Sequence, residues 1–343
     1  MKRIISIFIL IALMLSLTAC YMGEGATYTE TYLDFFNTVT TFSAFKSVSK
    51  TEFGRLGDLV EKTLSEYHKL YDIYFEYSGI NNLKTVNDNA GIAPVKVDEK
   101  IIDLLDYAIV LYDTTGGEMN IAMGAVLKIW HDARESAKAG NAYIPDMETL
   151  TAALSHTDIE NIVIDRENST VYLTDPGMSL DVGAIAKGYA TEMVAKMLES
   201  YGEEGYALNV GGNIRLVGSK ITATGEEPFK VGISHPRESG TIRTIEISSA
   251  SLVTSGDYER YFIYEGDRYH HIIDKDTLMP AAYFASVSIV AEDSGLADAL
   301  STALFAMDLE SGRALIDSLV GVEAMWITPS LEVYHTDGFP ISE

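Results

Sequence analysis

Apolar residues follow two different periods along this chain, and each period predicts a different kind of element. Residues 51–74 and 97–117 repeat apolar side chains at the helical spacing of three to four residues. The second of these stretches ends at two consecutive glycines, which is typical of a helix C-terminus. Apolar and polar residues alternate with the two-residue period of a strand over residues 161–165 and 170–174, and this pattern predicts a hairpin.

The rest of the pattern consists mainly of short strands. Residues 31–45 are β-rich, and residues 285–291 predict a strand that leads into a helix at 295–307. Between residues 205 and 275, turn signals separate the predicted strands 206–210, 212–218, 229–233, 243–248, 251–255, 260–264 and 269–274, and 322–328 closes the pattern. Strands and helices do not alternate regularly, so we predict an α+β fold with mixed or antiparallel sheets and packed helices.

The start of the chain has the pattern of an export signal. Lys2 and Arg3 precede sixteen uncharged residues, which are too few to span a bilayer as a helix. Small residues then precede Cys20, as in a bacterial lipoprotein signal, although a cysteine could also occur there by chance. We therefore predict a signal segment at 1–19, a tether at 20–29 and one folded domain at 30–343. Cys20 would carry a lipid that anchors the domain to the outside of the cell membrane.

Composition excludes several classes of protein. Cys20 is the only cysteine, so neither an intramolecular disulfide nor a cysteine-based zinc site is possible. The chain has 25 basic and 50 acidic residues, a net charge of −25, and such a surface repels nucleic acid. An anionic ligand would need a local device, such as a metal ion, a helix N-terminus or a well-placed lysine.

The stretch DVGAIAKGYA at residues 181–190 is the first candidate for such a device. One reading is an ordinary amphipathic helix in which Asp181 is the N-cap and Lys187 is solvated. The other is a phosphate site, in which small residues let the backbone approach a ligand and Lys187 supplies charge. The stretch alone does not decide between them.

The predicted helix at 295–307 is the second candidate. Asp298 and Thr302 are four residues apart and share one helix face, so both can offer oxygen to one Mg²⁺ ion. Alternatively, Thr302 bonds back to the carbonyl of residue 298 while Asp298 faces water.

The third candidate combines TSGDYERYF at 254–262 with HHIID at 270–274. Ser255 or Asp257 could contact a polar ligand near a tight turn. His270 and His271 are adjacent on a predicted strand, so their side chains point to opposite faces and at most one enters a given site. The stretch NVGGN at 209–213 is read as a β-turn. The nucleophile elbow, the HExxH zinc motif and the Walker motif are absent from the sequence.

Seven ordered motifs together resemble the FAD:protein FMN transferase (ApbE) family, formerly called thiamine-biosynthesis lipoproteins. The resemblance covers about residues 30–335. The motifs are FNT at 36–38, TGGEMN at 115–120, DVGAIAKGYA, NVGGN, TSGDYER, HIID at 271–274 and LADALSTALF at 296–305. The resemblance implies a T-fold-like architecture and binding of FAD and Mg²⁺.

The resemblance also implies roles for individual residues. Asp181 and Lys187 would contact FAD, and the backbone carbonyl of Ala184 would bind Mg²⁺ together with Asp298 and Thr302. Further FAD contacts are expected from Phe36, Tyr74 or Tyr77, Glu118, Met119, Asn120, Ser255 and His271. This chain departs from the family pattern at several of these places: Asn120 replaces an acidic residue, Phe36 and Asn37 replace Met and Gly, and Lys275 and Leu278 replace Pro and Gly.

The implied reaction transfers the FMN moiety of FAD to a Thr or Ser hydroxyl of an acceptor flavoprotein and releases AMP. Lys187 would offset phosphate charge, and His271 or Asp257 would be the general base. The acceptor would be an extracytoplasmic flavoprotein, such as a subunit of a membrane redox complex. Two alternatives are a Mg²⁺-dependent FAD pyrophosphatase, in which water replaces the acceptor, and a flavin-binding lipoprotein without turnover.

Overall fold

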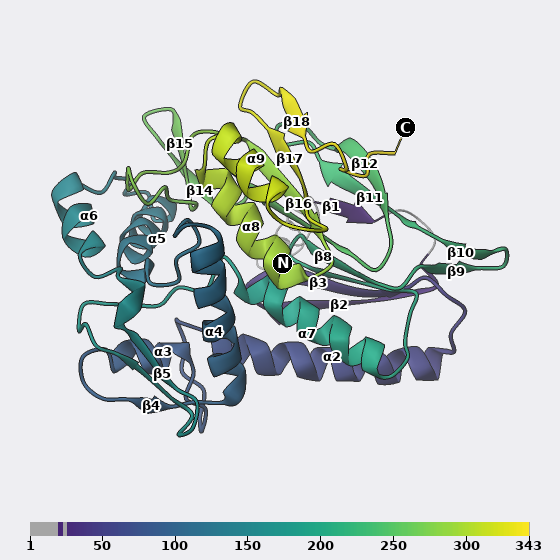
Figure 1. Ribbon diagram of the computed structural model, residues 1–343, viewed down its shortest axis with the longest axis horizontal. Helices are drawn as coiled ribbons and strands as arrows, with labels where there is room; N and C mark the ends of the chain where they lie inside the picture. Colours follow the sequence, from purple (N-terminus) through teal and green to yellow (C-terminus); the bar gives the residue numbers. More distant parts are fainter. Residues whose placement is uncertain (1–19, 23–25, 343) are drawn as a thin grey trace, which may run out of the picture.

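The computed structural model describes residues 20–22 and 26–342, and its centre is an eight-stranded sheet (Figure 1). Every neighbouring pair of strands in this sheet is antiparallel. Its order is β18 (Val333–His335), β17 (Glu323–Ile327), β16 (Ser286–Ala291), β13 (Ser251–Gly256), β8 (Asn213–Val217), β7 (Tyr206–Val210), β3 (Thr38–Ala44) and β2 (Tyr28–Phe35). The sheet confirms the predicted α+β class with antiparallel strands.

The two faces of the sheet belong to two different cores. Val253 packs in the core that includes the helices α2 (Lys50–Tyr71), α7 (Ala186–Ser200) and α8 (Ser294–Ala306). The preceding residue, Leu252, packs in a second core together with β11 (Phe229–Ser234) and β12 (Thr241–Ile247). This alternation is the two-residue period of a strand with both faces buried. A short strand, β1 (Cys20–Met22), pairs with β11.

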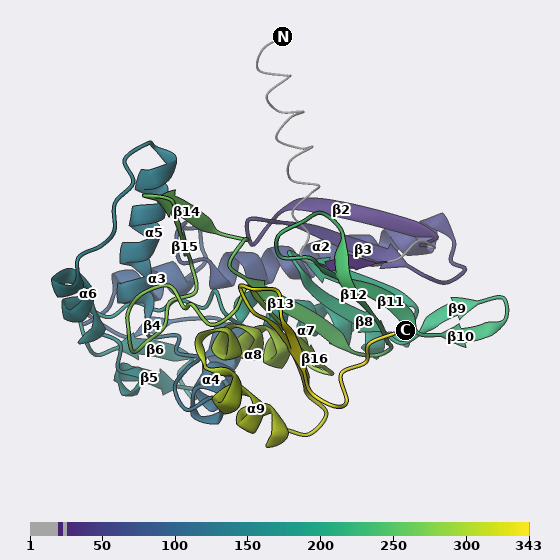
Figure 2. The same ribbon diagram turned by 90° about the horizontal axis from the view of Figure 1, so that it is seen from above.

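A second group of elements lies beside the sheet (Figures 1 and 2). It contains α3 (Leu83–Asp88), α4 (Glu99–Thr114), α5 (Gly124–Lys138), α6 (Met147–Leu154), the short 3₁₀ helix η1 (Ile159–Asn161), β4 (Val95–Lys96), β5 (Ile162–Asp165) and β6 (Thr170–Leu173). The hairpin of β14 (Tyr261–Tyr264) and β15 (Asp267–His270) packs on α5 through a third core that includes Trp130 and Phe262. The remaining elements are the hairpin β9 (Lys220–Thr222) and β10 (Gly225–Glu227), and α9 (Leu309–Asp317), which packs on β17.

Most of the predicted elements are present, with several corrections. The hairpin predicted at 161–165 and 170–174 is confirmed as β5 and β6. The β-rich stretch 31–45 is a hairpin, and Phe36 and Asn37 form its turn with φ of 51° and 55°. NVGGN is confirmed as a turn, in which Asn209 Oδ1 accepts a hydrogen bond from the Gly212 N–H at 2.9 Å. The predicted strand at 269–274 was too long, since β15 ends at His270, and α3, α5, α6 and α9 were not predicted.

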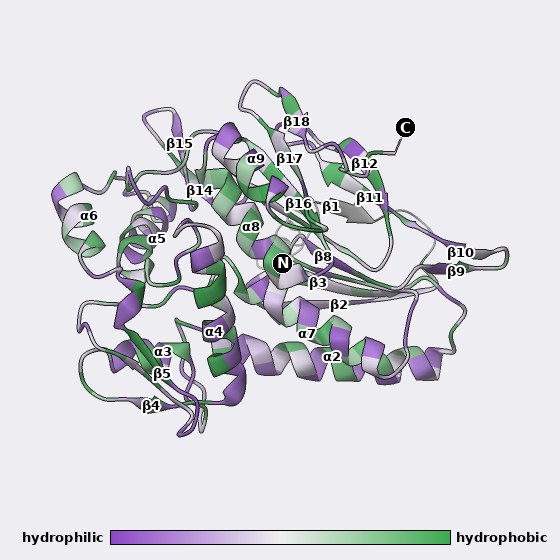
Figure 3. Cartoon of the chain, in the orientation of Figure 1, coloured by the Kyte–Doolittle hydropathy of each residue, from purple (hydrophilic) through white to green (hydrophobic). Residues whose placement is uncertain are grey.

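Helix amphipathicity explains why the long helices were predictable. Hydrophobic and hydrophilic residues alternate around α2 and α4 (Figure 3), and the buried positions of α2 recur every three or four residues. Ser49 caps α2 by accepting a hydrogen bond from the Glu52 N–H at 3.1 Å. These local signals predict a helix without knowledge of its tertiary partners.

The predicted signal segment 1–19 lies outside the described residues. Of the predicted tether at 20–29, residues 20–22 form β1, and residues 28 and 29 begin β2. Among the residues that the structure describes, no helix combines the length and apolar character needed to cross a membrane.

Candidate functional site

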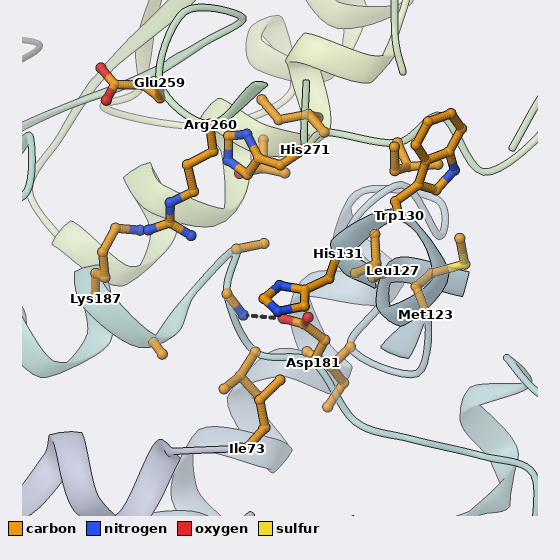
Figure 4. Close-up of a pocket in the computed structure, with 18 of the residues that line it drawn as sticks. Ile73, Met123, Leu127, Trp130, His131, Asp181, Lys187, Glu259, Arg260 and His271 are labelled. Atoms are coloured by element: carbon orange, nitrogen blue, oxygen red, sulfur yellow. Dashed lines mark hydrogen bonds between the residues drawn. The ribbon is translucent and has the colours of Figure 1, made fainter. Parts of the chain in front are cut away.

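A cavity of about 630 Å³ lies between the central sheet and the neighbouring group of elements (Figure 4). Its walls come from the β2–β3 turn, the end of α2 and the loop after it, residues 118–123, α5, residues 181–187, the start of β14, residues 271–275 and the end of α8. The cavity therefore brings together segments that are far apart in the sequence.

The start of the DVGAIAKGYA stretch forms a loop of the cavity wall. The Asp181 N–H donates to the Ile121 carbonyl at 2.8 Å, and Asp181 Oδ1 accepts from the Gly183 N–H at 2.8 Å (Figure 4). Helix α7 begins only at Ala186, after Ile185, which makes no side-chain cap. The reading of Asp181 as a helix N-cap is therefore wrong, because its backbone and carboxylate hold this loop against residue 121.

Gly188 lets α7 and α8 approach closely. A Cβ at this position would lie 2.3 Å from the Ser294 carbonyl oxygen and 2.5 Å from Asp298 Cβ. The Gly188 N–H donates to Asp298 Oδ2 at 2.8 Å. The second glycine of the motif thus brings the backbone of α7 to the carboxylate of α8.

Asp298 is the centre of a small group of polar atoms at the end of the cavity. Its side chain is buried, and both of its carboxylate oxygens lie 3.4 Å from Lys187 Nζ. The Thr302 hydroxyl, which lines the cavity, donates to the Asp298 carbonyl at 3.4 Å. The predicted back-bond is thus present, but the alternative in which Asp298 faces water is wrong, because the carboxylate faces Lys187 and Gly188.

The donor set at this place suits a hard cation. Asp298 offers carboxylate oxygen, Thr302 offers hydroxyl oxygen, and Ala184 is a further residue that lines the cavity. Within residues 20–22 and 26–342, no group of three or more His, Cys, Asp or Glu side chains is placed to hold a metal. An ion here would need water or substrate oxygens to complete its coordination, which is the habit of Mg²⁺. These residues therefore fit Mg²⁺ better than they fit zinc.

Ser255 lies behind this group and not in the cavity wall. Its hydroxyl is 2.8 Å from Ser301 Oγ and 3.5 Å from Thr302 Oγ1. The predicted direct contact between Ser255 and FAD has no support in this geometry, since the side chain positions α8 instead.

The two adjacent histidines have different surroundings, as the strand pattern predicts. His270 is buried, and its Nε2 donates to the Ala281 carbonyl at 2.8 Å. His271 lines the cavity, and its buried Nδ1 has no hydrogen-bond partner among the described residues. Burial, reinforced by the nearby charge of Arg260, lowers the pKa of His271 well below its usual range. His271 is therefore neutral at pH 7 and has a nitrogen lone pair available to accept a proton.

Asp257 does not fit the predicted role of a general base. Its two carboxylate oxygens accept hydrogen bonds from both terminal nitrogens of Arg237 at 2.7 Å, and Arg268 lies 3.1 Å away. Asp257 does not line the cavity. Because both oxygens are engaged by arginines and the side chain is not part of the cavity wall, this geometry gives no support to Asp257 as the base.

Residues 118–120 form another part of the wall. Burial raises the pKa of Glu118, although its carboxylate lies 3.3 Å from Lys275 Nζ. Met119 lines the cavity as well, although its side chain is almost fully buried. The Asn120 amide donates to the Thr157 carbonyl and accepts from the Ala122 N–H, at 3.0 and 2.8 Å. Asn120 thus shapes the loop, and the neutral side chain that replaces the expected acid satisfies both of these bonds.

Aromatic side chains enclose a third part of the cavity. Phe36, at the β2–β3 turn, contacts His68 edge to face at 5.5 Å. Tyr74 stacks on His131 with 5.1 Å between ring centroids. Tyr74 lines the cavity, whereas the Tyr77 hydroxyl is turned to Asp72 Oδ2 at 2.8 Å. Of the two tyrosines predicted as alternatives, Tyr74 is the one at the cavity.

Several cavity residues were missed by the sequence analysis. Trp130, His131 and Arg134 come from α5, which was not predicted as a helix. Glu259 and Arg260 belong to a stretch that was quoted, but only Ser255 and Asp257 were selected from it. Burial raises the pKa of Glu259. The signal that could have identified Arg260 was its position at the start of the predicted strand 260–264, which leads back to His271.

Comparison with known proteins gives consistent results. The model of the ApbE family matches residues 36–326. An FAD:protein FMN transferase from Treponema pallidum is 36% identical over 269 residues, which cover 75% of this chain and 73% of that protein. One from Klebsiella pneumoniae is 30% identical over 251 residues, which cover 72% of this chain and 75% of that protein.

Solved structures resemble the whole described fold. The crystal structure of the ApbE protein from Thermotoga maritima has a TM-score of 0.79 and 29% identity, and the match covers 90% of this chain and 97% of that one. The flavin transferase ApbE from Vibrio cholerae has a TM-score of 0.73 and 25% identity, with coverage of 91% and 98%. The fold described here is thus similar to that of a known flavin transferase.

Proposed function

The chain belongs to the ApbE family, and on this premise we propose that it is an FAD:protein FMN transferase. It transfers the FMN moiety of FAD to a Ser or Thr hydroxyl of an acceptor flavoprotein and releases AMP. The observation that carries this proposal is the meeting of Lys187, His271 and Thr302 in one cavity, with Asp298 directly behind them. Attack of a hydroxyl on a diphosphate requires a cationic group, a neutral base and oxygen ligands for a metal ion, and these residues supply all three.

The bond changes assign a task to each of these residues. The acceptor oxygen forms a bond to the FMN-side phosphorus while the bond from that phosphorus to the bridging oxygen breaks, and AMP leaves with that oxygen. Negative charge grows on the departing phosphate, and Lys187 lies in position to stabilise it. The acceptor hydroxyl loses its proton, which His271 accepts as a neutral imidazole.

Mg²⁺ belongs to the proposal as a cofactor held by Asp298, Thr302 and the Ala184 carbonyl. When bound, it would supply Lewis-acid stabilisation of phosphate charge. Contacts with Lys187 and the Gly188 N–H fix the buried Asp298 carboxylate in place for this role. Asp181, Phe36, Tyr74 and Glu118 line the remainder of the cavity and would bind the nucleotide and flavin parts of FAD.

We also propose that the protein works outside the cell membrane, anchored by a lipid on Cys20. The pattern of residues 1–20 supports this, and an acceptor in a membrane redox complex would be within reach of an anchored enzyme. Replacement of Cys20 by Ser should move the protein from the membrane fraction to the soluble one. A variant that still sediments with membranes would remove the lipid anchor from the proposal.

The transferase is tested by incubating the full-length protein in detergent with FAD, Mg²⁺ and a candidate acceptor. Intact-mass measurement of the acceptor and chromatography of the nucleotides give the result. An acceptor heavier by one FMN, with one AMP released for each, is expected. Free FMN and AMP beside an unmodified acceptor would favour the pyrophosphatase. Intact FAD that stays bound to the protein would favour a flavin-binding lipoprotein.

A further inference from the structure

Two arginines that have no part in the mechanism above also face the cavity. Arg134 comes from α5, and Arg260 comes directly before β14. Because α5 and β14 share one core, the two arginines are carried by one packed unit. In the view of Figure 4, Arg260 extends past His271 toward Lys187. Burial, and after it the charge of Arg260, lowers the pKa of Arg134, so the two guanidinium groups repel each other.

The cavity is much less acidic than the chain as a whole. Its lining contains five cationic side chains, Arg134, Lys138, Lys187, Arg260 and Lys275, and five carboxylates, Asp72, Glu118, Glu135, Asp181 and Glu259. The net charge of the chain, in contrast, is −25. A locally balanced lining in such a protein is what a site for an anionic ligand needs.

Three of the five cations already have a carboxylate partner. Lys275 lies 3.3 Å from Glu118, Lys138 lies 2.7 Å from Glu135, and Lys187 lies 3.4 Å from Asp298. The two arginines differ from these lysines. The carboxylate contact of Arg134 is to Glu135 at 4.0 Å, and Arg260 forms no ion pair with any residue that the structure describes. Arg134 also contacts His131 Nδ1 through one terminal nitrogen at 2.9 Å, which adds no counter-charge. Two guanidinium groups that line one cavity without close carboxylate partners are stabilised by a ligand that carries two negative charges.

We propose that Arg134 and Arg260 form a two-arginine subsite for the diphosphate of FAD. This rests on the proposed function, which supplies the diphosphate ligand. Guanidinium groups donate paired N–H bonds to phosphate oxygens, so the two arginines fix the orientation of the diphosphate as well as its charge. Arg260 extends beside His271. Its hydrogen bonds to the diphosphate therefore hold the FMN-side phosphorus near His271, the base that accepts the proton.

The test compares FAD affinity between variants, with flavin fluorescence as the readout at several KCl concentrations. Arg134→Gln and Arg260→Gln should each weaken FAD binding by about tenfold or more, which is the size of a lost charge-assisted hydrogen bond. Their affinities should also depend less steeply on KCl. Riboflavin, which lacks the diphosphate, should bind to wild type and variants alike. Arg260→Lys should recover part of the loss, because it keeps the charge but not the planar fork.

Arg166→Gln is the matched control, because it removes one positive charge from an exposed ion pair with Asp103 and Asp106 outside the cavity. It should bind FAD as wild type does. FAD affinities within twofold of wild type in both arginine variants would overturn the subsite, and so would an equal loss of riboflavin affinity. Wild type that binds FAD without modifying an acceptor would count against the proposed transferase, while the affinities alone still judge the subsite. Wild type that fails to bind FAD would overturn both.

Discussion

Lys187 Nζ lies 3.4 Å from both carboxylate oxygens of Asp298, at the point where α7 crosses α8. The neighbouring Gly188 N–H donates to the same carboxylate at 2.8 Å. The carboxylate is thus fixed by two groups of the motif that was ambiguous in the sequence. Lys187 offsets the charge of this carboxylate, and under the proposed function the same ammonium group would also donate to phosphate oxygens of FAD.

We first predict that Asp298→Asn slows FMN transfer about 100-fold or more. The substitution keeps the shape of the side chain but removes the charge that would hold Mg²⁺. The rate of AMP release, measured over a titration of Mg²⁺, checks this. Asp113→Asn removes one exposed carboxylate from α4, outside the cavity, and should leave the rate unchanged. Equal rates in Asp298→Asn and wild type at every Mg²⁺ concentration would refute the role of Asp298.

The second prediction concerns the base. His271→Gln should lower the transfer rate by a factor of about 100 to 10,000 while FAD still binds, since general base catalysis typically contributes that much. The rate of wild type should fall only when the pH drops below the ordinary histidine range, because burial lowers the pKa of His271. Single-turnover rates between pH 5 and 8 measure both effects. A wild-type rate in His271→Gln would exclude this histidine from proton transfer.

Third, the same burial makes stability depend on pH. In the unfolded chain His271 takes up a proton as the pH falls through about 6.5, but in the folded protein it stays neutral to a lower pH, because burial lowers its pKa. The unfolded state therefore binds more protons in this window. The free energy of unfolding falls there as pH falls, by at most about 1.4 kcal/mol per pH unit for this group.

Urea unfolding at pH 7.5, 6.5 and 5.5 tests the third prediction. The difference between wild type and His271→Gln should favour wild type less at pH 5.5 than at pH 7.5, since the glutamine does not titrate. A difference that stays constant across this range would show that His271 titrates alike in the folded and unfolded chain.

How much of the molecule is predictable from its sequence depends on how far apart the cooperating residues are. The α2 and α4 helices and the β5–β6 hairpin were predicted because their signals lie within one element. His271 was preferred to His270 by the resemblance to a family motif, and the structure brings His271, not His270, to the cavity. The ordered motifs also led to the family that the comparisons show.

The failures have a common physical cause, which is long-range packing. Asp181 looks like a helix cap, but its N–H is taken by Ile121, which is 60 residues earlier in the sequence. Asp257 looks like a free carboxylate, but Arg237 holds it across 20 residues. No local pattern marks these partners. The α5 helix was missed as well, and with it Arg134, whose relation to Arg260 exists only in the folded protein.

The fourth prediction tests the close approach of α7 and α8. Gly188→Ala should destabilise the protein by about 1–3 kcal/mol, because the added methyl group meets the Ser294 carbonyl oxygen and Asp298 Cβ. It should also slow FMN transfer, since any shift of α8 moves Asp298. Gly54→Ala is the matched control: this glycine lies in α2 with no atom within 4 Å of an added Cβ. That variant should be more stable than wild type by about 0.5–1 kcal/mol. Equal effects of the two substitutions would contradict the packing argument.

The last prediction concerns a buried ion pair that supports the same helices. Arg215 Nε lies 2.9 Å from Glu192 Oε2, and both side chains are buried. The same oxygen accepts the Ser294 N–H at 3.0 Å, so Glu192 links β8 to the first turn of α8. Arg215→Met should cost about 3–5 kcal/mol, because it leaves the buried carboxylate with only the more distant and exposed Lys196, at 3.7 Å, as a cationic partner.

A double-mutant cycle separates that cost from the value of the pair itself. Adding Glu192→Gln to Arg215→Met should restore part of the lost stability, since the amide removes the uncompensated charge and its oxygen can still accept from Ser294. Arg243→Met, at an exposed position of β12, should change stability by less than about 0.5 kcal/mol. If the double variant in urea unfolding loses the full sum of the two single losses, the charges are independent and the pair does not hold α7, α8 and the sheet together. A smaller loss instead means that the two side chains are coupled, and that Glu192 is needed at this place mainly as the counter-charge of Arg215.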